Sequence, residues 1–134
     1  MTQLTGYQEK GWGYEIIWAN NEKYSGKILN FSVAGAKTSL GFHKERDKTL
    51  FINAGQFTLR LIDTVTAEVK EVLLKEGDVF NIPALHPHQL IATQPNSMIF
   101  EVGTKDTVED NYKVAPGDTQ LKKVKENGKT DIPS

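Results

Sequence analysis

All three histidines of this 134-residue sequence fall in two short segments. His43 ends one β-type run, and His86 and His88 follow a turn that contains a proline. Histidine is the commonest metal ligand and the usual acid–base group near neutral pH. His86 stands between leucine and proline in the predicted turn, which favours an ordinary surface role. For His43 and His88 together, a shared site is the alternative to two ordinary surface or core histidines, and the wider sequence context decides between them.

Glu101 is a charged residue that could join them, and so is Lys48 if it faces the same pocket. Glu101 interrupts an otherwise apolar run, so it would serve as a base or pair with Lys48 if it faces a pocket, and would be an ordinary surface residue otherwise. An inward Lys48 would disfavour protonation of the neighbouring imidazoles. Such a pocket would suit an anion, a sugar phosphate or a carboxylate. The alternative is a Lys48 that reaches into water from the pocket mouth.

Short β-type runs separated by turns must position these residues. The runs cover residues 12–19, 27–34, 48–53, 57–62, 67–74, 79–82, 88–93 and 97–102. Phe57, Leu59 and Leu61 alternate with residues of a second face, and Arg60 on that face is expected to be solvated. Closely spaced strands without an amphipathic helix favour a β-sandwich or barrel over a parallel α/β sheet.

Composition excludes several classes of function. The chain has no cysteine, which removes disulfides and thiolate chemistry. Sixteen basic residues nearly balance seventeen acidic ones, so no overall field attracts nucleic acid or a membrane surface. The polar start of the chain does not resemble a signal peptide, and no apolar run is long enough to cross a bilayer. We expect a cytoplasmic protein that binds neither nucleic acid nor membrane.

Two motifs carry a resemblance to a known family. The stretch Glu-Lys-Gly-Trp-Gly-Tyr-Glu at residues 9–15 and the segment Gly-Asp-Val-Phe-Asn-Ile-Pro-Ala-Leu-His-Pro-His at residues 77–88 occur in order, with residues 43–47 between them. This pattern resembles the small single-domain cupins related to mannose-6-phosphate isomerases, over residues 9 to about 118. The resemblance implies an antiparallel double-stranded β-helix, the cupin jelly-roll barrel, over residues 1–118. A polar tail or arm at 119–134 and a homodimer formed through an edge strand are also expected.

The resemblance also implies a site for one divalent metal ion. Carried over by position, its four ligand slots fall on Gly41, His43, Lys48 and His88. Only His43 and His88 keep a ligand atom, so a metal would be weakly held or absent. Strand parity places Glu45 on the same face as His43, where it could supply a third ligand if the strand stays regular.

The aromatic residues near the start of the resemblance are candidate ligand contacts. Trp12 and Tyr14 could stack on a sugar ring, although aromatic residues in an early strand more often cover the open side of a barrel as core.

Three functional hypotheses follow. The first is a cupin that binds a sugar-like or anionic small molecule at a degenerate metal site. The second is a sugar-phosphate or nucleotide-sugar isomerase or epimerase, with or without a metal, in which His43, His88, Lys48 or Glu101 carries the acid–base chemistry. The third, an iron dioxygenase, needs at least three protein ligands, of which the sequence offers two.

Overall fold

The computed structural model describes residues 5–115, which form eleven β-strands and no helix. The strands are β1 (Gly6–Lys10), β2 (Gly13–Asn20), β3 (Ser25–Phe31), β4 (Leu40–Phe42), β5 (Lys48–Ala54), β6 (Gln56–Ile62), β7 (Val69–Lys75), β8 (Val79–Ile82), β9 (His88–Ala92), β10 (Ser97–Gly103) and β11 (Tyr112–Ala115). The expected all-β class is confirmed. No helix capable of spanning a membrane occurs in this part of the chain.

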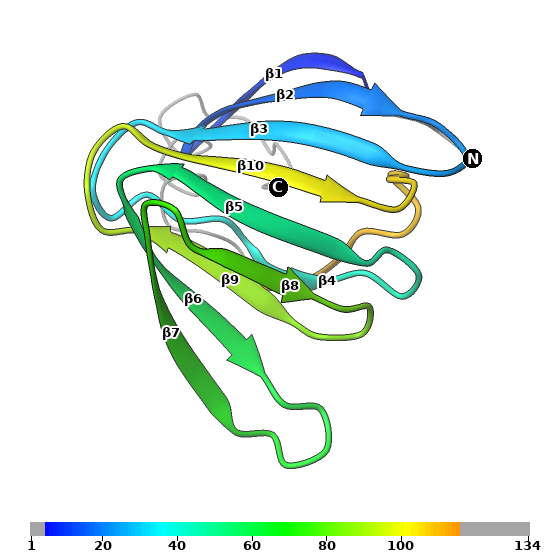
Figure 1. Ribbon diagram of the computed structural model, residues 1–134. Coiled ribbons are helices and arrows are strands. Elements are labelled where there is room, and N and C mark those ends of the chain that lie inside the picture. The colour runs from blue at the N-terminus through cyan, green and yellow to red at the C-terminus, as the bar shows by residue number, and fades with distance from the viewer. Residues whose placement is uncertain (1–4, 116–134) are drawn as a thin grey trace, which may run out of the picture.

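The strands form two antiparallel sheets packed face to face (Figure 1). One sheet has the order β1-β2-β3-β10-β5-β8, and the other has the order β11-β4-β9-β6-β7. Strand β10 lies between β3 and β5, and β9 lies between β4 and β6, so the neighbours in space are distant in sequence. This crossing between two layers is the jelly-roll arrangement that the sequence predicts.

The hydrophobic core fills the space between the inner faces of the sheets. The Trp12 ring stacks on Phe31 at 4.4 Å between centroids, and Phe31 meets Phe57 edge-on at 4.9 Å. Trp12 itself stands in the turn between β1 and β2, so it closes the core where those strands begin. Each fully buried aromatic or aliphatic side chain contributes about 1.5–3 kcal/mol relative to exposure.

The predicted runs correspond to eight of the strands, with ends that differ by at most three residues. The alternation at 57–61 is confirmed, because Phe57 and Leu59 are buried while Arg60 is exposed and pairs with Glu71. The run that ends at His43 contains β4, whereas two short strands, β1 and β11, were not predicted. The predicted tail at 119–134 lies outside the described residues.

A tight turn between β5 and β6 depends on Gly55. Its φ is +77°, and a Cβ there would lie 2.8 Å from the Ser97 Cα. Gly35 has a similar φ of +88° but open space around the Cβ position. We expect Gly55→Ala to lower the free energy of unfolding by more than about 2 kcal/mol, against about 1 kcal/mol for Gly35→Ala. Urea denaturation of both variants measures the difference, and equal losses would contradict the overlap with Ser97.

Candidate anion-binding cavity

A cavity of about 110 Å³ opens between the inner faces of the two sheets. Strands β2, β3, β5 and β10 line one side, and β4, β9 and β11 line the other. The charged and imidazole side chains that line it are Lys10, Glu15, Lys27, His43, Lys48, His88, Glu101 and Lys113. The structure thus brings His43, His88, Lys48 and Glu101 together, as the sequence predicts.

The two imidazoles have the same tautomer. His43 Nδ1 lies 3.0 Å from the Asp110 carbonyl oxygen, and His88 Nδ1 lies 2.9 Å from the carbonyl oxygen of His86. A carbonyl oxygen only accepts hydrogen bonds, so Nδ1 carries the proton on each ring. The unprotonated Nε2 atoms are therefore left as acceptors on two rings whose centroids are 6.1 Å apart.

Both histidines are held neutral. Burial lowers the pKa of His43 to about 4, and the nearby Lys48 charge acts in the same direction. Burial and then Lys48 also hold the pKa of His88 well below its usual range. At neutral pH the positive charge of the cavity therefore comes from lysines, and the imidazoles offer lone pairs.

Glu101 connects Lys48 to the most deeply buried cation of the fold. One Glu101 oxygen lies 3.4 Å from Lys48 Nζ, and the other lies 2.8 Å from Arg46 Nη1. Burial alone would raise the pKa of Glu101, but the charges of Lys48, Arg46 and Lys27 hold it well below its usual range. Burial lowers the pKa of Lys48, and Glu101 partly opposes this shift. Glu101 therefore stays a carboxylate and fixes the position of the lysine.

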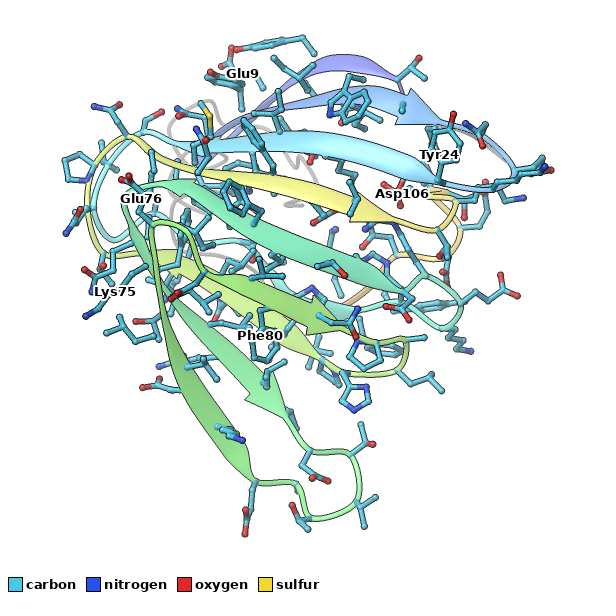
Figure 2. All side chains as sticks on the ribbon, viewed as in Figure 1. Glu9, Tyr24, Lys75, Glu76, Phe80 and Asp106 are labelled. Carbon is cyan, nitrogen blue, oxygen red and sulfur yellow. The ribbon has the colours of Figure 1, made fainter. Side chains whose placement is uncertain are left out.

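A second group of buried charges extends this network. Lys27 Nζ lies 2.6 Å from Asp106 and 3.9 Å from Glu15, and Arg46 Nε lies 4.0 Å from Asp106. Figure 2 labels Asp106 at the end of the six-stranded sheet, beyond β10. Burial would lower the pKa of Lys27, but its three carboxylate neighbours raise it. The charge of Lys27 is thus balanced by these carboxylates, whereas Lys48 shares the Glu101 carboxylate with Arg46.

Asp110 holds the connection between β4 and β5 in place. Its carboxylate accepts hydrogen bonds from the backbone N–H groups of Lys44, Glu45 and Arg46. Its carbonyl oxygen accepts the proton of His43 Nδ1. The same residue therefore orients an imidazole of the site and aligns Arg46 for its pairing with Glu101.

The lining of the cavity carries more positive than negative charge. Four lysines line it, Lys10, Lys27, Lys48 and Lys113, against Glu15 and Glu101. Lys10 lies 3.8 Å from Glu15, which also pairs with Lys27, and burial lowers the pKa of both Lys10 and Lys113. An anion entering the cavity would offset this excess of cations.

Trp12 adds a hydrogen-bond donor without a partner. Its side chain is 3% exposed and lines the cavity, and its indole Nε1 has no hydrogen-bond partner among the described residues. A buried donor without a partner is costly, by about 1–3 kcal/mol. A ligand oxygen within reach would remove this cost.

The family model described as "Cupin" matches residues 16–124. The chain belongs to the cupin family. No curated protein matches its sequence.

Several solved structures share the fold of this cupin. KdgF from Halomonas sp. superposes with a TM-score of 0.63 at 20% identity, over 77% of this chain and 88% of that one. Oxalate decarboxylase from Bacillus subtilis gives 0.73 at 16% identity, over 94% of this chain and 35% of that one. CapF from Staphylococcus aureus superposes with a TM-score of 0.71 at 12% identity, over 85% of this chain and 33% of that one. This cupin spans only about a third of the last two chains. Sequence identities this low show a shared fold and nothing further.

Two predicted site residues lie elsewhere. Glu45 is exposed and is not among the lining residues of this cavity. The parity argument fails because β4 ends at Phe42, so the chain turns before Glu45. Tyr14 lies on the outer face of its sheet, stacked on Tyr7 at 5.4 Å. Trp12 does reach the cavity.

The lysines that sequence reasoning missed come from elements with weak signals. Lys10 lies on β1 and Lys113 on β11, the two strands that were not predicted. Lys27 and Glu15 were inside predicted runs. Both alternate with apolar residues that face outward, and this alternation was the signal that could have placed them on the inner face.

The side chains of this cupin do not fit a complete metal site. No group of three or more histidine, aspartate or glutamate side chains suited to a metal occurs within residues 5–115. Of the four slots that the resemblance implies, Lys48 holds an amine paired with Glu101, and Gly41 has no side chain. Gly41 is directly opposite His88, and a Cβ there would lie 2.7 Å from the Tyr112 carbonyl oxygen. Strand β11 thus excludes a larger residue at that slot.

The neutral imidazoles predict a dependence of stability on pH. The pKa of His43 is about 4 in the folded protein and about 6.5 in the unfolded chain. Between these values the unfolded state binds the extra proton, so stability falls as pH decreases through this window. The variant His43→Asn keeps a donor for the Asp110 carbonyl oxygen. Between pH 7 and pH 4.5 we expect its free energy of unfolding to fall by up to about 3 kcal/mol less than that of the wild type.

Urea unfolding at a series of pH values measures this effect. His86→Asn is the matched control, because His86 does not line the cavity, and it should keep the slope of the wild type. Equal slopes for the wild type and His43→Asn would show that the imidazole is not held neutral.

Proposed function

We propose that this cupin binds a small anionic molecule, a carboxylate or phosphate with sugar-like hydroxyl groups, directly on side chains in place of a metal. The observation that carries the proposal is the Lys48 ammonium in the same cavity as two neutral imidazoles, at a position where the family resemblance implies a metal ligand. An ammonium supplies the positive charge that a metal would otherwise give to an anionic ligand.

The remaining groups fit the hydroxyl groups and the acceptor oxygens of such a ligand. The His43 and His88 Nε2 atoms accept hydrogen bonds, so they suit the hydroxyl groups of a sugar-like molecule. Trp12 Nε1 is a donor, so it suits a carboxylate, phosphate or carbonyl oxygen. The volume of about 110 Å³ suits a small molecule and not a polymer.

An isomerase or epimerase is the second candidate, because two unprotonated imidazoles and an ammonium lie in one cavity. A base whose conjugate acid has a pKa of about 4, as His43 has, removes a carbon-bound proton poorly near neutral pH. Glu101 is weakened as a base by Arg46 and Lys48. These shifts favour binding over proton transfer. If the wild type turned over hexose phosphates or nucleotide sugars and His88→Asn did not, catalysis by proton transfer would be favoured over binding.

Isothermal titration calorimetry with gluconate, glucose 6-phosphate and uncharged glucose tests the binding proposal. We expect the two anions to bind more tightly than glucose, with affinity that falls as salt increases. Lys48→Met, and also Lys113→Met at the exposed edge of the cavity, should each lower the affinity for the anions at least tenfold. Lys75→Met is the matched control, because Lys75 lies at the turn between β7 and β8 (Figure 2), away from the lining residues. Equal binding of anions and glucose would contradict the proposal.

Trp12→Phe isolates the contribution of the indole N–H. Phenylalanine keeps an aromatic ring for stacking on Phe31 but cannot donate a hydrogen bond. We expect at least a tenfold loss of anion affinity, since a hydrogen bond to a charged acceptor contributes about 1.5–3 kcal/mol. Any loss of thermal stability in the absence of ligand should come from the smaller ring and not from the N–H, which has no partner there. Unchanged anion affinity would remove Trp12 from the site.

A further inference from the structure

The cationic side chains of the cavity form two groups. In the six-stranded sheet, Lys10 comes from the edge strand β1, and Lys48 comes from β5, with β2, β3 and β10 between them (Figure 1). In the five-stranded sheet, Lys113 comes from the edge strand β11, and His88 comes from β9, with β4 between them. Burial lowers the pKa of Lys113, and the charge of Lys10 acts in the same direction, so these two edge lysines lie near each other. We call Lys10 and Lys113 the mouth lysines, because both are more exposed than the buried Lys48.

Gly41 leaves one wall of the cavity free of side chains between the two groups. Lys113 pairs with Gly41, and Gly41 pairs with His88, so the three residues share one face of their sheet. Neighbouring strands lie about 4.8 Å apart, which places the backbones of Lys113 and His88 roughly 10 Å from each other. An extended ligand can therefore lie across Gly41 and reach both groups.

The charges around the cavity leave an excess of two cations. The charged lining residues and their ion-pair partners comprise five cations, Lys10, Lys27, Lys48, Lys113 and Arg46, and three carboxylates, Glu15, Glu101 and Asp106. The carboxylate of Asp110 does not line the cavity and is held by three backbone N–H groups. Buried charges without a counterion are costly, so two anionic charges on a ligand would balance the cavity.

The mouth of the cavity is short of hydrogen-bond acceptors. Glu15 lies 3.8 Å from Lys10 and 3.9 Å from Lys27, so the mouth lysines depend on a carboxylate that a third lysine also uses. The Glu15 charge also opposes the lowering of the Lys113 pKa by burial and by Lys10. Trp12, in the turn that follows Lys10, adds a buried N–H without an acceptor among the described residues. Two ammonium groups and a free donor are the composition of an anion site.

We propose that the mouth lysines and Trp12 form a second anion subsite, so that the ligand carries an anionic group at each of its ends, as the six-carbon diacid of a sugar does. This inference rests on the proposed function, in which Lys48 receives the first anionic group. The hydroxyl groups in the middle of such a chain would lie over Gly41, next to the His88 imidazole that accepts hydrogen bonds. A ligand with a single anionic group would leave one end of the cavity with its excess cation.

Glucarate and gluconate are the matched probes, because they differ only in the carboxylate that replaces the terminal hydroxymethyl group. In calorimetric titrations of the full chain, we expect glucarate to bind at least tenfold more tightly than gluconate. Lys113→Met should abolish this preference, so that its affinity for glucarate falls at least tenfold further than its affinity for gluconate. Lys113 is exposed, so the variant should keep the wild-type fold, which thermal melting checks.

Two control variants separate a specific subsite from the net charge of the protein. Lys113→Arg keeps a cation at the mouth of the cavity and should retain the preference for glucarate. Lys75→Met removes one positive charge at the end of β7, away from the lining residues, and should also retain it.

The outcomes distinguish this inference from the proposed function. If gluconate bound more tightly than glucose but as tightly as glucarate, the second subsite would be overturned and the first would stand. A preference for glucarate that survives in Lys113→Met would also overturn the second subsite, because the second carboxylate would then bind elsewhere. If gluconate bound no more tightly than glucose, the proposed function itself would fail.

Discussion

The ion pair between Arg46 and Glu101 is the interaction on which the site depends. The two side chains are 1% and 2% exposed, and removing one partner of such a buried pair typically costs about 3–5 kcal/mol. Arg46 also donates to Ser25 Oγ and to the Thr104 carbonyl oxygen, so it connects β3 with the segment after β10. Its position fixes Glu101, and Glu101 in turn holds Lys48 at the cavity.

This network explains how a barrel core tolerates so many charges. Glu15, Asp106 and Glu101 balance Lys27, Arg46 and Lys48 within one chain of ion pairs. Burying any one of these groups alone would be very unfavourable. The net positive charge of the lining arises only where Lys10 and Lys113 are added. The fold thus holds a neutral charged core, and the additional lysines give the cavity its preference for anions.

Much of this arrangement could be predicted from the sequence, because strand alternation and the turn residues are local signals. His43, His88 and Lys48 were predicted because the family resemblance places them at ligand slots, and Glu101 because it stood out from an apolar run. Lys10 and Lys113 were missed because β1 and β11 are short, and because β11 pairs with β4, which is far away in the sequence. The role of Arg46 was also missed, since its partners Ser25, Glu101 and Thr104 come from distant segments. Glu45 was misplaced because the end of β4 is set by the Asp110 contacts and not by local periodicity.

The central claim is that the Lys48 ammonium, and not a divalent cation, supplies the positive charge near the two imidazoles. Elemental analysis of the full chain purified without chelators tests it most directly, with His88→Ala measured beside the wild type. The account predicts far less than one metal ion per chain in both proteins. Close to one equivalent in the wild type, lost in His88→Ala, would contradict it and would show that the imidazoles hold a metal ion despite Lys48.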